Sequence, residues 1–538
     1  MLPGHRAARL GNYMPPDKTT HTSAETIGAL LRRQANAYEQ SPFLIVPESG
    51  ETVLFSQAAD ASAAVGIFLA QSGFVAGDPV ALILANGKEA ALSLLGIMSA
   101  GGVAVPLNPR LTPDEIGQAL KQSSARFVIC HSSRSHEAEL SCEGFTCATQ
   151  GTIQNLHIAL LTQSVAAKGL TVATDQVSHH SAALILFTSG TTGRPKGVVL
   201  SHTNLLANAS FVRDAHHLTP DDIALCVLAL FHINGLVVTL LTPLLTGMAV
   251  VLPERFCAEQ FWSWIADHRV TWFSAVPTIL SLLLSHPAPG GTQTATLRFA
   301  RSASAPLPVA ILEEFEQRFA IPVIETYGIS EAACQVTANP LPPLLHKPGS
   351  AGVAVGNLLR VVDEQDAEVP HGRTGEVVLR GENVFSGYLD NPKADQEALK
   401  GGWFHTGDLG FLDEDGYLFL TGRKKEIINR AGEKISPREV EEVIHCLPQV
   451  EAVGVVGVPD ELYGEEVTAF VTLRPGCSLN AESIKRFCRE HLAGFKTPRE
   501  VLFIEEFPKG PSGKIQRRRL VDLYNKIKKK GGLNEKNL

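Results

Sequence analysis

The chain has 538 residues, 44% of them hydrophobic, and this length predicts at least two domains, because one hydrophobic core seldom grows so large. Its formal net charge of -8 argues against a nucleic-acid-binding protein, which presents a basic face. Nine cysteines, odd in number and without a C-x-x-C pair, argue against a disulfide scaffold and favour free thiols in a reducing compartment.

The first predicted elements alternate between short strands and longer helices. Strands are expected at residues 80–84, 103–107 and 126–130, and helices begin at Lys88 and after Thr112. Thr112 is the predicted N-cap of the second helix, with Pro113 at the first helical position and Glu115 closing a capping box. This alternation is typical of an α/β fold in which crossover helices join parallel strands.

The stretch LFTSGTTGRPKGVVLSH, residues 186–202, predicts a polar loop between two strands. Its glycines allow the backbone to approach an anion, its hydroxyls can donate hydrogen bonds, and Lys196 adds a positive charge. It is not a Walker loop, because Lys196 is followed by glycine instead of serine or threonine. Alone, the loop fits a polyphosphate or a plain polar turn. The candidate phosphate-binding residues are Thr188, Ser189, Gly190, Thr191, Thr192, Gly193 and Lys196.

Residues 223–253 carry no Asp, Glu, Lys or Arg and are long enough to suggest a membrane span. Polar residues, glycines and Pro243 interrupt them, so we expect core packing in a large α/β domain, with residues 248–252 as a buried strand after a helix. No secretory signal is visible at the N-terminus, and we expect a cytoplasmic protein without a transmembrane segment.

A domain boundary is predicted near Gly422. Before it, residues 413–422 read as a hairpin turning at Asp415-Gly416, and after it a charged stretch leads to a helix capped by Ser436 with Glu439 at the box position. Another helix is expected from Ala481 to about residue 492. We therefore predict a large N-terminal domain of several subdomains, residues 1–421, and a small mobile α+β domain, residues 422–538.

Five separate motifs give the chain a family resemblance. They are the loop described above, YGISE (327–331), GWFHTGDLG (402–410), GRKKEIINRAGEKI (422–435) and PSGKIQRR (511–518). In order and spacing they resemble the adenylate-forming family, which contains acyl-CoA synthetases, firefly luciferase and peptide-synthetase adenylation domains. The resemblance extends from about Ser23 to Leu520. It implies a ligase that uses ATP, Mg²⁺, CoA and a small-molecule carboxylic acid.

The resemblance implies that ATP binds where these motifs meet. Asp408 is expected on the ribose hydroxyls, with Arg423 beside it, and Lys196 on the β- and γ-phosphates. Glu331 is expected on the magnesium side as the metal-binding carboxylate, and Ser330, where the family usually has threonine, as a donor to the α-phosphate. The residues expected to wall the adenine are Ser304, Ala305, Pro306, Glu325, Thr326, Tyr327 and Gly328.

Within the family, the reaction has two steps, formation of acyl-AMP from ATP and transfer of the acyl group to CoA, and the small domain is expected to serve both. Alone, Asp408 in its TGD turn would indicate a turn former and Lys514 a surface charge. Within the family, Lys514 reaches into the active site and bridges the substrate carboxylate and the α-phosphate during adenylation. The domain then swings about a hinge at Lys425 and presents a CoA-binding segment to the pantetheine arm. This segment comprises Arg430, Ala431 and Gly432.

Three other functions stay open on the sequence. A free-standing adenylation enzyme could load a separate carrier protein instead of CoA, and CoA-dependent AMP release separates the two. A non-catalytic nucleotide-binding relative is disfavoured by the joint presence of the five candidate residues Lys196, Glu331, Asp408, Arg423 and Lys514. A luciferase-like oxygenase is possible in principle. The sequence gives no oligomeric state.

The acyl pocket is expected to hold a small or medium acid with a polar end. Within the family the chain most resembles the oxalate:CoA ligase branch, through TWFSAVPTIL, HKPGSAG and LAGFKTP among other segments. It departs from that branch at Phe187, Asn234 and Cys334, where histidines are expected, and this puts oxalate itself in doubt. The residues expected to line the pocket are His232, Asn234, Ser304, Gly328 and Cys334.

Overall fold

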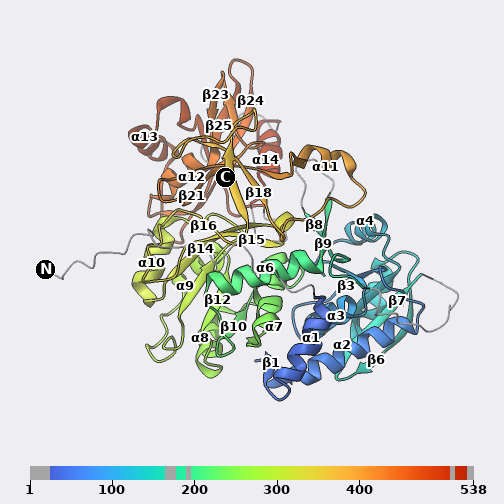
Figure 1. The fold of residues 1–538 in the computed structure, drawn as a ribbon. Helices are drawn as coiled ribbons and strands as arrows, with labels where there is room; N and C mark the ends of the chain where they lie inside the picture. The colour runs from blue at the N-terminus through green and yellow to red at the C-terminus, as the bar shows by residue number, and fades with distance from the viewer. Residues whose placement is uncertain (1–24, 164–176, 189–194, 509–514, 530–538) are drawn as a thin grey trace.

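The computed structural model describes residues 25–163, 177–188, 195–508 and 515–529. Figure 1 shows a broad lower part, coloured from blue through green to yellow, and a smaller orange and red part above it. Within the described ranges, no helix combines the length and the apolar character needed to cross a membrane. All nine cysteines are free thiols, as the sequence predicted.

The first large sheet has seven strands in the order β6-β7-β5-β3-β4-β8-β9. Its strands are β3 (Pro79–Ile83), β4 (Val103–Pro106), β5 (Phe127–His131), β6 (Thr146–Ile153), β7 (Leu156–Thr162), β8 (Ala182–Thr188) and β9 (Lys196–Ser201). Strands β3, β4 and β5 are parallel, joined by helices α3 (Lys88–Ser99) and α4 (Pro113–Ser123). Thr112 and Glu115 form the predicted capping box. The sequence prediction is confirmed for these elements.

The second large sheet has nine strands in the order β16-β15-β14-β13-β12-β10-β11-β1-β2. They are β1 (Pro42–Val46), β2 (Glu51–Leu54), β10 (Ile223–Cys226), β11 (Ala249–Val251), β12 (Trp272–Ala275), β13 (Phe299–Ser302), β14 (Val323–Ile329), β15 (Cys334–Ala338) and β16 (Val353–Ala354). The run from β14 to β1 is parallel, and the strands outside it are antiparallel. The charge-free stretch supplies β10, a π-helix (Asn234–Leu241), α7 (Thr242–Thr246) and β11, all packed in the core as predicted.

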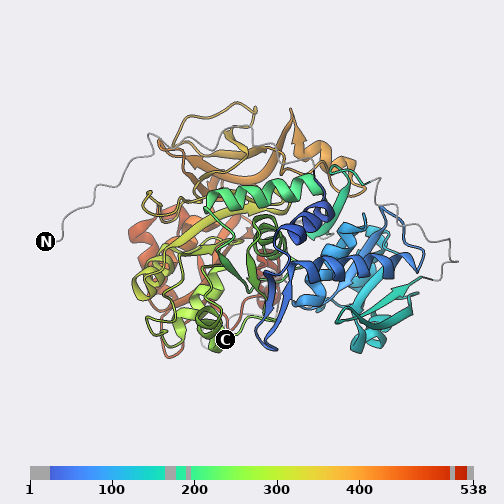
Figure 2. The ribbon, with the colours of Figure 1, turned by 60° about the horizontal axis from the view of Figure 1, so that its bottom comes forward.

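Helices cover and connect these two sheets. The remaining ones in the large domain are α1 (Ile27–Ala37), α2 (Phe55–Ala70), α5 (Ser135–Ser141), α6 (His202–Ala215), α8 (Ala258–Asp267), α9 (Pro277–Ser285), α10 (Val309–Phe319) and α11 (Pro392–Ala398). Helix α6 contacts β9 of the first sheet and β15 of the second. Figure 2 shows this green helix lying across the blue and yellow-green halves. It therefore ties the two sheets together next to the strand ends that carry the predicted motifs.

A third sheet carries the TGD sequence, residues 406–408, inside one of its strands. It has the order β17-β18-β20-β19, and β21 pairs with β20. Its strands are β17 (Leu358–Val362), β18 (Gly375–Arg380), β19 (Leu399–Lys400), β20 (Trp403–Leu412) and β21 (Leu418–Arg423). The turn between β20 and β21 is the predicted hairpin, in which the Asp413 carboxylate accepts from the Tyr417 amide at 2.9 Å.

The small domain begins where the chain leaves this sheet after Arg423. Its own sheet has the order β23-β22-β25-β24, with β26 on β25. Its elements are β22 (Ile428–Arg430), β23 (Glu433–Ile435), α12 (Pro437–His445), β24 (Val450–Asp460), β25 (Gly464–Leu473), α13 (Ala481–His491), β26 (Glu500–Phe503) and α14 (Arg517–Lys529). The predicted helices are present, but the predicted capping box on α12 is wrong. The Ser436 hydroxyl donates to the Thr421 carbonyl of β21 instead, so it binds the helix to the large domain.

Candidate active site

The polar loop of residues 189–194 joins two antiparallel strands, as the sequence predicted. Thr188 ends β8 and pairs with Lys196, which begins β9, and the Thr188 hydroxyl donates to the Lys196 carbonyl at 3.4 Å. The candidate residues Ser189, Gly190, Thr191, Thr192 and Gly193 lie outside the described residues, and so does Lys514. The structure therefore positions the two ends of the loop and one of its cationic residues.

Tyr388 lies between the candidate phosphate lysine and the candidate metal carboxylate. The Lys196 Nζ lies 4.5 Å from the centroid of the Tyr388 ring. The Tyr388 hydroxyl donates to Glu331 Oε1 at 2.9 Å. Burial and the Glu331 charge raise the pKa of this phenol, which keeps it protonated as a donor. Sequence reasoning missed Tyr388, because a lone tyrosine in SGYLDNP carries neither a charge nor a motif.

Asp408 stands at the meeting point of three strands. Its Oδ2 accepts from the Tyr327 hydroxyl of β14 at 2.6 Å, and its Oδ1 lies 2.7 Å from Nε of Arg423 on β21. The carboxylate is buried, with 5% of the residue exposed. The negative charge of Asp408 raises the pKa of Arg423, and burial opposes this rise. Smaller contributions from Tyr327, Glu426 and Glu331 also raise it. Arg423 thus pairs directly with Asp408, and the Glu331 charge makes a smaller contribution to its raised pKa.

The candidate adenine wall forms where two parallel strands end side by side. Ser302 at the end of β13 pairs with Glu325 of β14, and the Thr326 hydroxyl donates to the Ser302 carbonyl at 3.1 Å. Burial raises the pKa of Glu325 to about 7, although its Oε2 accepts from the Gly349 amide at 2.8 Å. The structure brings together the two predicted segments. They comprise Ser304, Ala305 and Pro306 after β13, and Glu325, Thr326, Tyr327 and Gly328 within β14.

The next turn continues this wall toward Glu331. A short 3₁₀ helix (Ser330–Ala332) follows β14 and places Ser330 directly before Glu331. Both side chains are partly exposed, whereas the alanines that follow them are buried in the core. A hydroxyl and a carboxylate therefore stand side by side at the surface of the site.

The candidate acyl-pocket residues fall into two contacting pairs. Asn234, the first residue of the π-helix, donates from Nδ2 to the Ser304 hydroxyl at 3.3 Å. A Cβ on Gly328 would lie 1.9 Å from the Cys334 carbonyl oxygen, so only glycine permits this approach of the two strands. His232 lies two residues before Asn234, with its ring 4.6 Å from that of Phe231.

Arg301 is a second residue that sequence reasoning missed. It is fully buried in β13 and donates to Asn234 Oδ1 at 3.0 Å. Nothing in the string RFARSAS distinguished it from Arg298, which forms an ion pair with Asp222 at 2.6 Å. The fold alone distinguishes the two arginines, because it buries Arg301 fully in the core and leaves Arg298 partly exposed.

The candidate CoA-binding segment forms an exposed turn in the small domain. Ala431 and Gly432 connect β22 and β23 with φ values of 52° and 91°. Arg430 forms an ion pair with Glu466 and stacks over the Tyr463 ring at 4.2 Å. In Figure 1 the hairpin ending in β23 lies at the top, away from β8 and β9. Lys425 lies in the turn between β21 and β22, where the chain passes from one sheet to the other.

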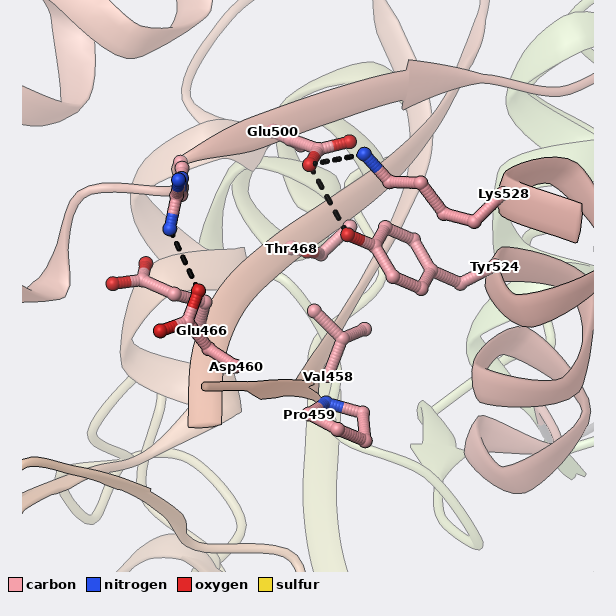
Figure 3. A pocket seen from close by; sticks show the side chains of 9 residues that line it. Val458, Pro459, Asp460, Glu466, Thr468, Glu500, Tyr524 and Lys528 are labelled. Carbon is pink, nitrogen blue, oxygen red and sulfur yellow. Dashed lines mark hydrogen bonds and ion pairs between the residues drawn. The ribbon is translucent and has the colours of Figure 1, made fainter. Parts of the chain in front are cut away.

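A separate pocket of about 170 Å³ lies wholly within the small domain. Its charged side chains are paired, as Figure 3 shows for Glu500, which accepts from Lys528 at 2.9 Å and from Tyr524 at 3.1 Å. Glu466 pairs with Arg430 outside the pocket. Arg499 and Asp460 form a third pair at 2.7 Å. This pocket contains none of the predicted ATP, acyl or CoA residues, and its charges are already balanced by protein partners.

Comparison with known proteins identifies the class. The sequence model described as AMP-binding enzyme matches residues 31–389, and the one described as AMP-binding enzyme C-terminal domain matches residues 439–514. The chain belongs to this family of AMP-binding, adenylate-forming enzymes. Within it, the chain is an ATP-dependent, AMP-forming acyl-CoA synthetase, near the oxalate:CoA ligase branch.

Individual relatives cover nearly the whole chain. A sulfoacetate–CoA ligase from Cupriavidus necator is 39% identical over 504 residues, covering 93% of this chain and 98% of the relative. An oxalate–CoA ligase from Arabidopsis thaliana is 41% identical over 466 residues, covering 84% and 89%. The crystal structure of ATP-bound MatB from Rhodopseudomonas palustris matches with a TM-score of 0.82 and 28% identity, covering 94% of this chain and 100% of that one.

Proposed function

We propose that this acid:CoA ligase activates a small or medium carboxylic acid with a polar end at the site between Asp408, Glu331 and Lys196. The observation that carries the proposal is the position of Arg423. Its guanidinium forms an ion pair with Asp408 at 2.7 Å and also interacts with Glu331. Arg423 thereby pairs with the carboxylate proposed for the ribose, and the negative charge of the carboxylate proposed for the metal contributes to raising its pKa.

The proposed reaction has two steps. In the first, a carboxylate oxygen of the acid attacks the α-phosphorus of ATP, a P–O bond forms, and the bond to the β-phosphate oxygen breaks to release pyrophosphate. In the second, the CoA sulfur attacks the acyl carbon of the acyl-AMP, loses its proton, and expels AMP. Lys196 and Lys514 would offset the charge that develops on phosphate oxygens in the first step.

The residues at Glu331 fit a magnesium ion that arrives with the nucleotide. Mg²⁺ is commonly held by one or two carboxylates together with substrate phosphates, so a single oriented carboxylate is sufficient. Tyr388 fixes Glu331 by the 2.9 Å hydrogen bond of its hydroxyl, and Lys196 lies over the face of the same ring. Glu331 would hold the ion, which when bound offsets phosphate charge, while Lys196 would contact the phosphates directly.

Asp408 retains hydrogen-bonding capacity for the ribose. Each of its oxygens already accepts one protein donor, from Tyr327 and from Arg423, and a carboxylate offers about four acceptor positions. The two remaining positions suit two vicinal hydroxyls. The adenine would lie against the strand ends that carry Ser304 and Glu325.

The small domain would alternate between two tasks. Lys514 would serve adenylation, and rotation near Lys425 would bring Arg430, Ala431 and Gly432 to the pantetheine arm. Beyond its chain neighbours, no atom of the described residues lies within 4 Å of the position of a Cβ on Gly432, so its side of the turn would be open to a thiol. Since all nine cysteines are free, we place the enzyme in the reducing cytoplasm.

A screen of acids tests the proposed function. Pyrophosphate release is measured with ATP, Mg²⁺ and each of oxalate, malonate, a sulfonated acetate, an aryl acrylate and a long-chain fatty acid, with and without CoA. We expect the small polar acids to support release and CoA to be required for AMP and thioester formation. Preference for the long-chain acid would refute the substrate class. Pyrophosphate release with acyl-AMP that CoA never consumes would instead support transfer to a carrier protein.

A further inference from the structure

Arg301 is a buried cation that neutral amide and hydroxyl side chains hold by hydrogen bonds. It lies in β13 between β12 and β14, with none of its surface exposed. Its guanidinium donates to Asn234 Oδ1 and Ser274 Oγ, each at 3.0 Å, and to Gln335 Oε1 at 3.1 and 3.2 Å. Ser274 is its neighbour in register on β12. Three polar side chains from three different elements thus hold one orientation of the guanidinium.

No carboxylate forms an ion pair with Arg301 in the described part of the chain. The titratable groups that interact with it are Cys334, which hydrogen-bonds to the guanidinium, and His216. Burial, followed by the charge of Arg301, lowers the pKa of His216 to about 3, so this imidazole is neutral at pH 7. Burial lowers the pKa of Arg301 as well, but an arginine keeps its proton in proteins. A buried charge without a counterion is unfavourable, and proteins seldom keep one without a use.

A chain of hydrogen bonds connects Arg301 to the residues of the candidate acyl pocket. Because Asn234 Oδ1 accepts from Arg301 and from Ser274 at 3.2 Å, its Nδ2 is turned the other way, toward the Ser304 hydroxyl at 3.3 Å. Ser304 is only partly buried and has φ at 73°. A hydroxyl that accepts from an amide has its own proton free to donate. The chain Arg301, Asn234, Ser304 therefore ends in a donor at the edge of the site.

We propose that Arg301, acting through Asn234 and Ser304, makes the acyl pocket selective for carboxylic acids that carry a second anionic group, a carboxylate or a sulfonate. This inference rests on the proposed function, in which the acid lies beside Ser304. The anion would accept hydrogen bonds from Ser304 and Asn234, and the charge of Arg301 behind them would offset its desolvation. Arg301 is a positioning residue, since it reaches the acid through Asn234.

The test compares each anionic acid with an uncharged acid of the same shape. The pairs are malonate with its monoamide and sulfoacetate with methylsulfonylacetate, and the readout is the ratio of the two kcat/KM values in acyl-CoA formation. We expect the wild-type enzyme to favour the anionic member. In R301M the ratio should fall on the order of 10- to 100-fold through KM for the anionic acid, whereas R301K should retain most of it.

A second variant keeps the test decisive where R301M fails to fold. Asn234→Asp places a carboxylate against Arg301, which should stabilise the fold while neutralising the charge, and we expect it to lower the ratio as R301M does. Arg298→Met is the matched control, because it removes an arginine three residues earlier that already pairs with Asp222. It should lower stability and leave the ratio unchanged.

Three results would overturn the inference. They are a wild-type ratio near one, an equal loss for both members of each pair in R301M, or an unchanged ratio in N234D. An enzyme that makes AMP from none of the acids would instead refute the proposed function, so the two failures are distinguishable.

Discussion

Tyr388 positions two charged side chains that would otherwise be independent. Its hydroxyl fixes Glu331 and its ring lies under Lys196. Tyr388→Phe removes only the hydroxyl, and we expect kcat/KM for ATP to fall on the order of 10-fold, because the hydrogen bond to a carboxylate is lost. Tyr388→Leu removes the ring as well and should lose a further few-fold. Steady-state kinetics with varied ATP measures both, and equal losses in the two variants would exclude the ring from this role.

The raised pKa of Glu325 should make the stability of the protein depend on pH. Its pKa rises from 4.5 to about 7 on burial, so the folded protein binds this proton more tightly than the unfolded chain does. Stability attributable to the proton is present at low pH and is lost as the pH rises from 4.5 to about 7. Glu325→Gln keeps an acceptor for Gly349 without the charge. Urea unfolding should show it gaining about 2 kcal/mol more, relative to wild type, at pH 8 than at pH 5. The same gain at both values would contradict the assignment.

The sequence predicted the residues that carry their own chemistry and missed those defined by their surroundings. Asp408, Glu331 and Lys196 were assigned from motifs, and the structure pairs Asp408 with Arg423 and places Glu331 and Lys196 against the same tyrosine, Tyr388. Arg301 and Tyr388 escaped because their partners are distant in the sequence. Arg301 lies 67 residues from Asn234, and Tyr388 lies 57 from Glu331. Only the tertiary packing of distant elements, which local periodicity does not encode, brings such residues into contact.

At the scale of elements, sequence motifs predicted the helix caps and turns whose hydrogen bonds join residues close together in the chain. The Thr112 box and the hairpin at Asp415 formed as predicted, because their hydrogen bonds lie within a few residues. Ser436 shows where such a signal fails. Its hydroxyl could have hydrogen-bonded to a backbone amide in the first turn of α12, but it donates to the Thr421 carbonyl of β21 instead.

The proposed mechanism requires the small domain to rotate at the turn between β21 and β22. It holds Lys425, and the Glu426 amide donates to the Arg423 carbonyl at 2.9 Å. Lys425→Pro fixes one backbone dihedral there, so we expect thioester formation to fall at least 10-fold while adenylation survives. Lys425→Ala, which leaves the backbone free, is the control. Separate assays of pyrophosphate release and of CoA transfer measure the two steps. A proline variant that forms thioester at the normal rate would remove Lys425 from the hinge role.

Across the whole molecule, the two half-reactions should depend on different faces of the small domain. Lys514→Ala should lower adenylation on the order of 100-fold or more and spare much of the transfer from preformed acyl-AMP to CoA, because Lys514 would contact only the first transition state. Lys526→Ala, which alters an exposed lysine of α14, is the control. Rapid-quench assays started from ATP and from acyl-AMP separate the two rates. Equal losses in both would contradict a two-position small domain.

The fate of the carboxylate oxygen tests the central claim most directly. The enzyme is incubated with an acid that it uses as a substrate, labelled with ¹⁸O in both oxygens of the reacting carboxyl group, together with unlabelled ATP and CoA. The masses of the products are then measured by mass spectrometry. If a carboxylate oxygen attacks the α-phosphorus and the CoA sulfur then displaces AMP, the AMP carries one ¹⁸O and the acyl-CoA retains the other. Unlabelled AMP, or formation of ADP and phosphate, would contradict an acyl-adenylate intermediate.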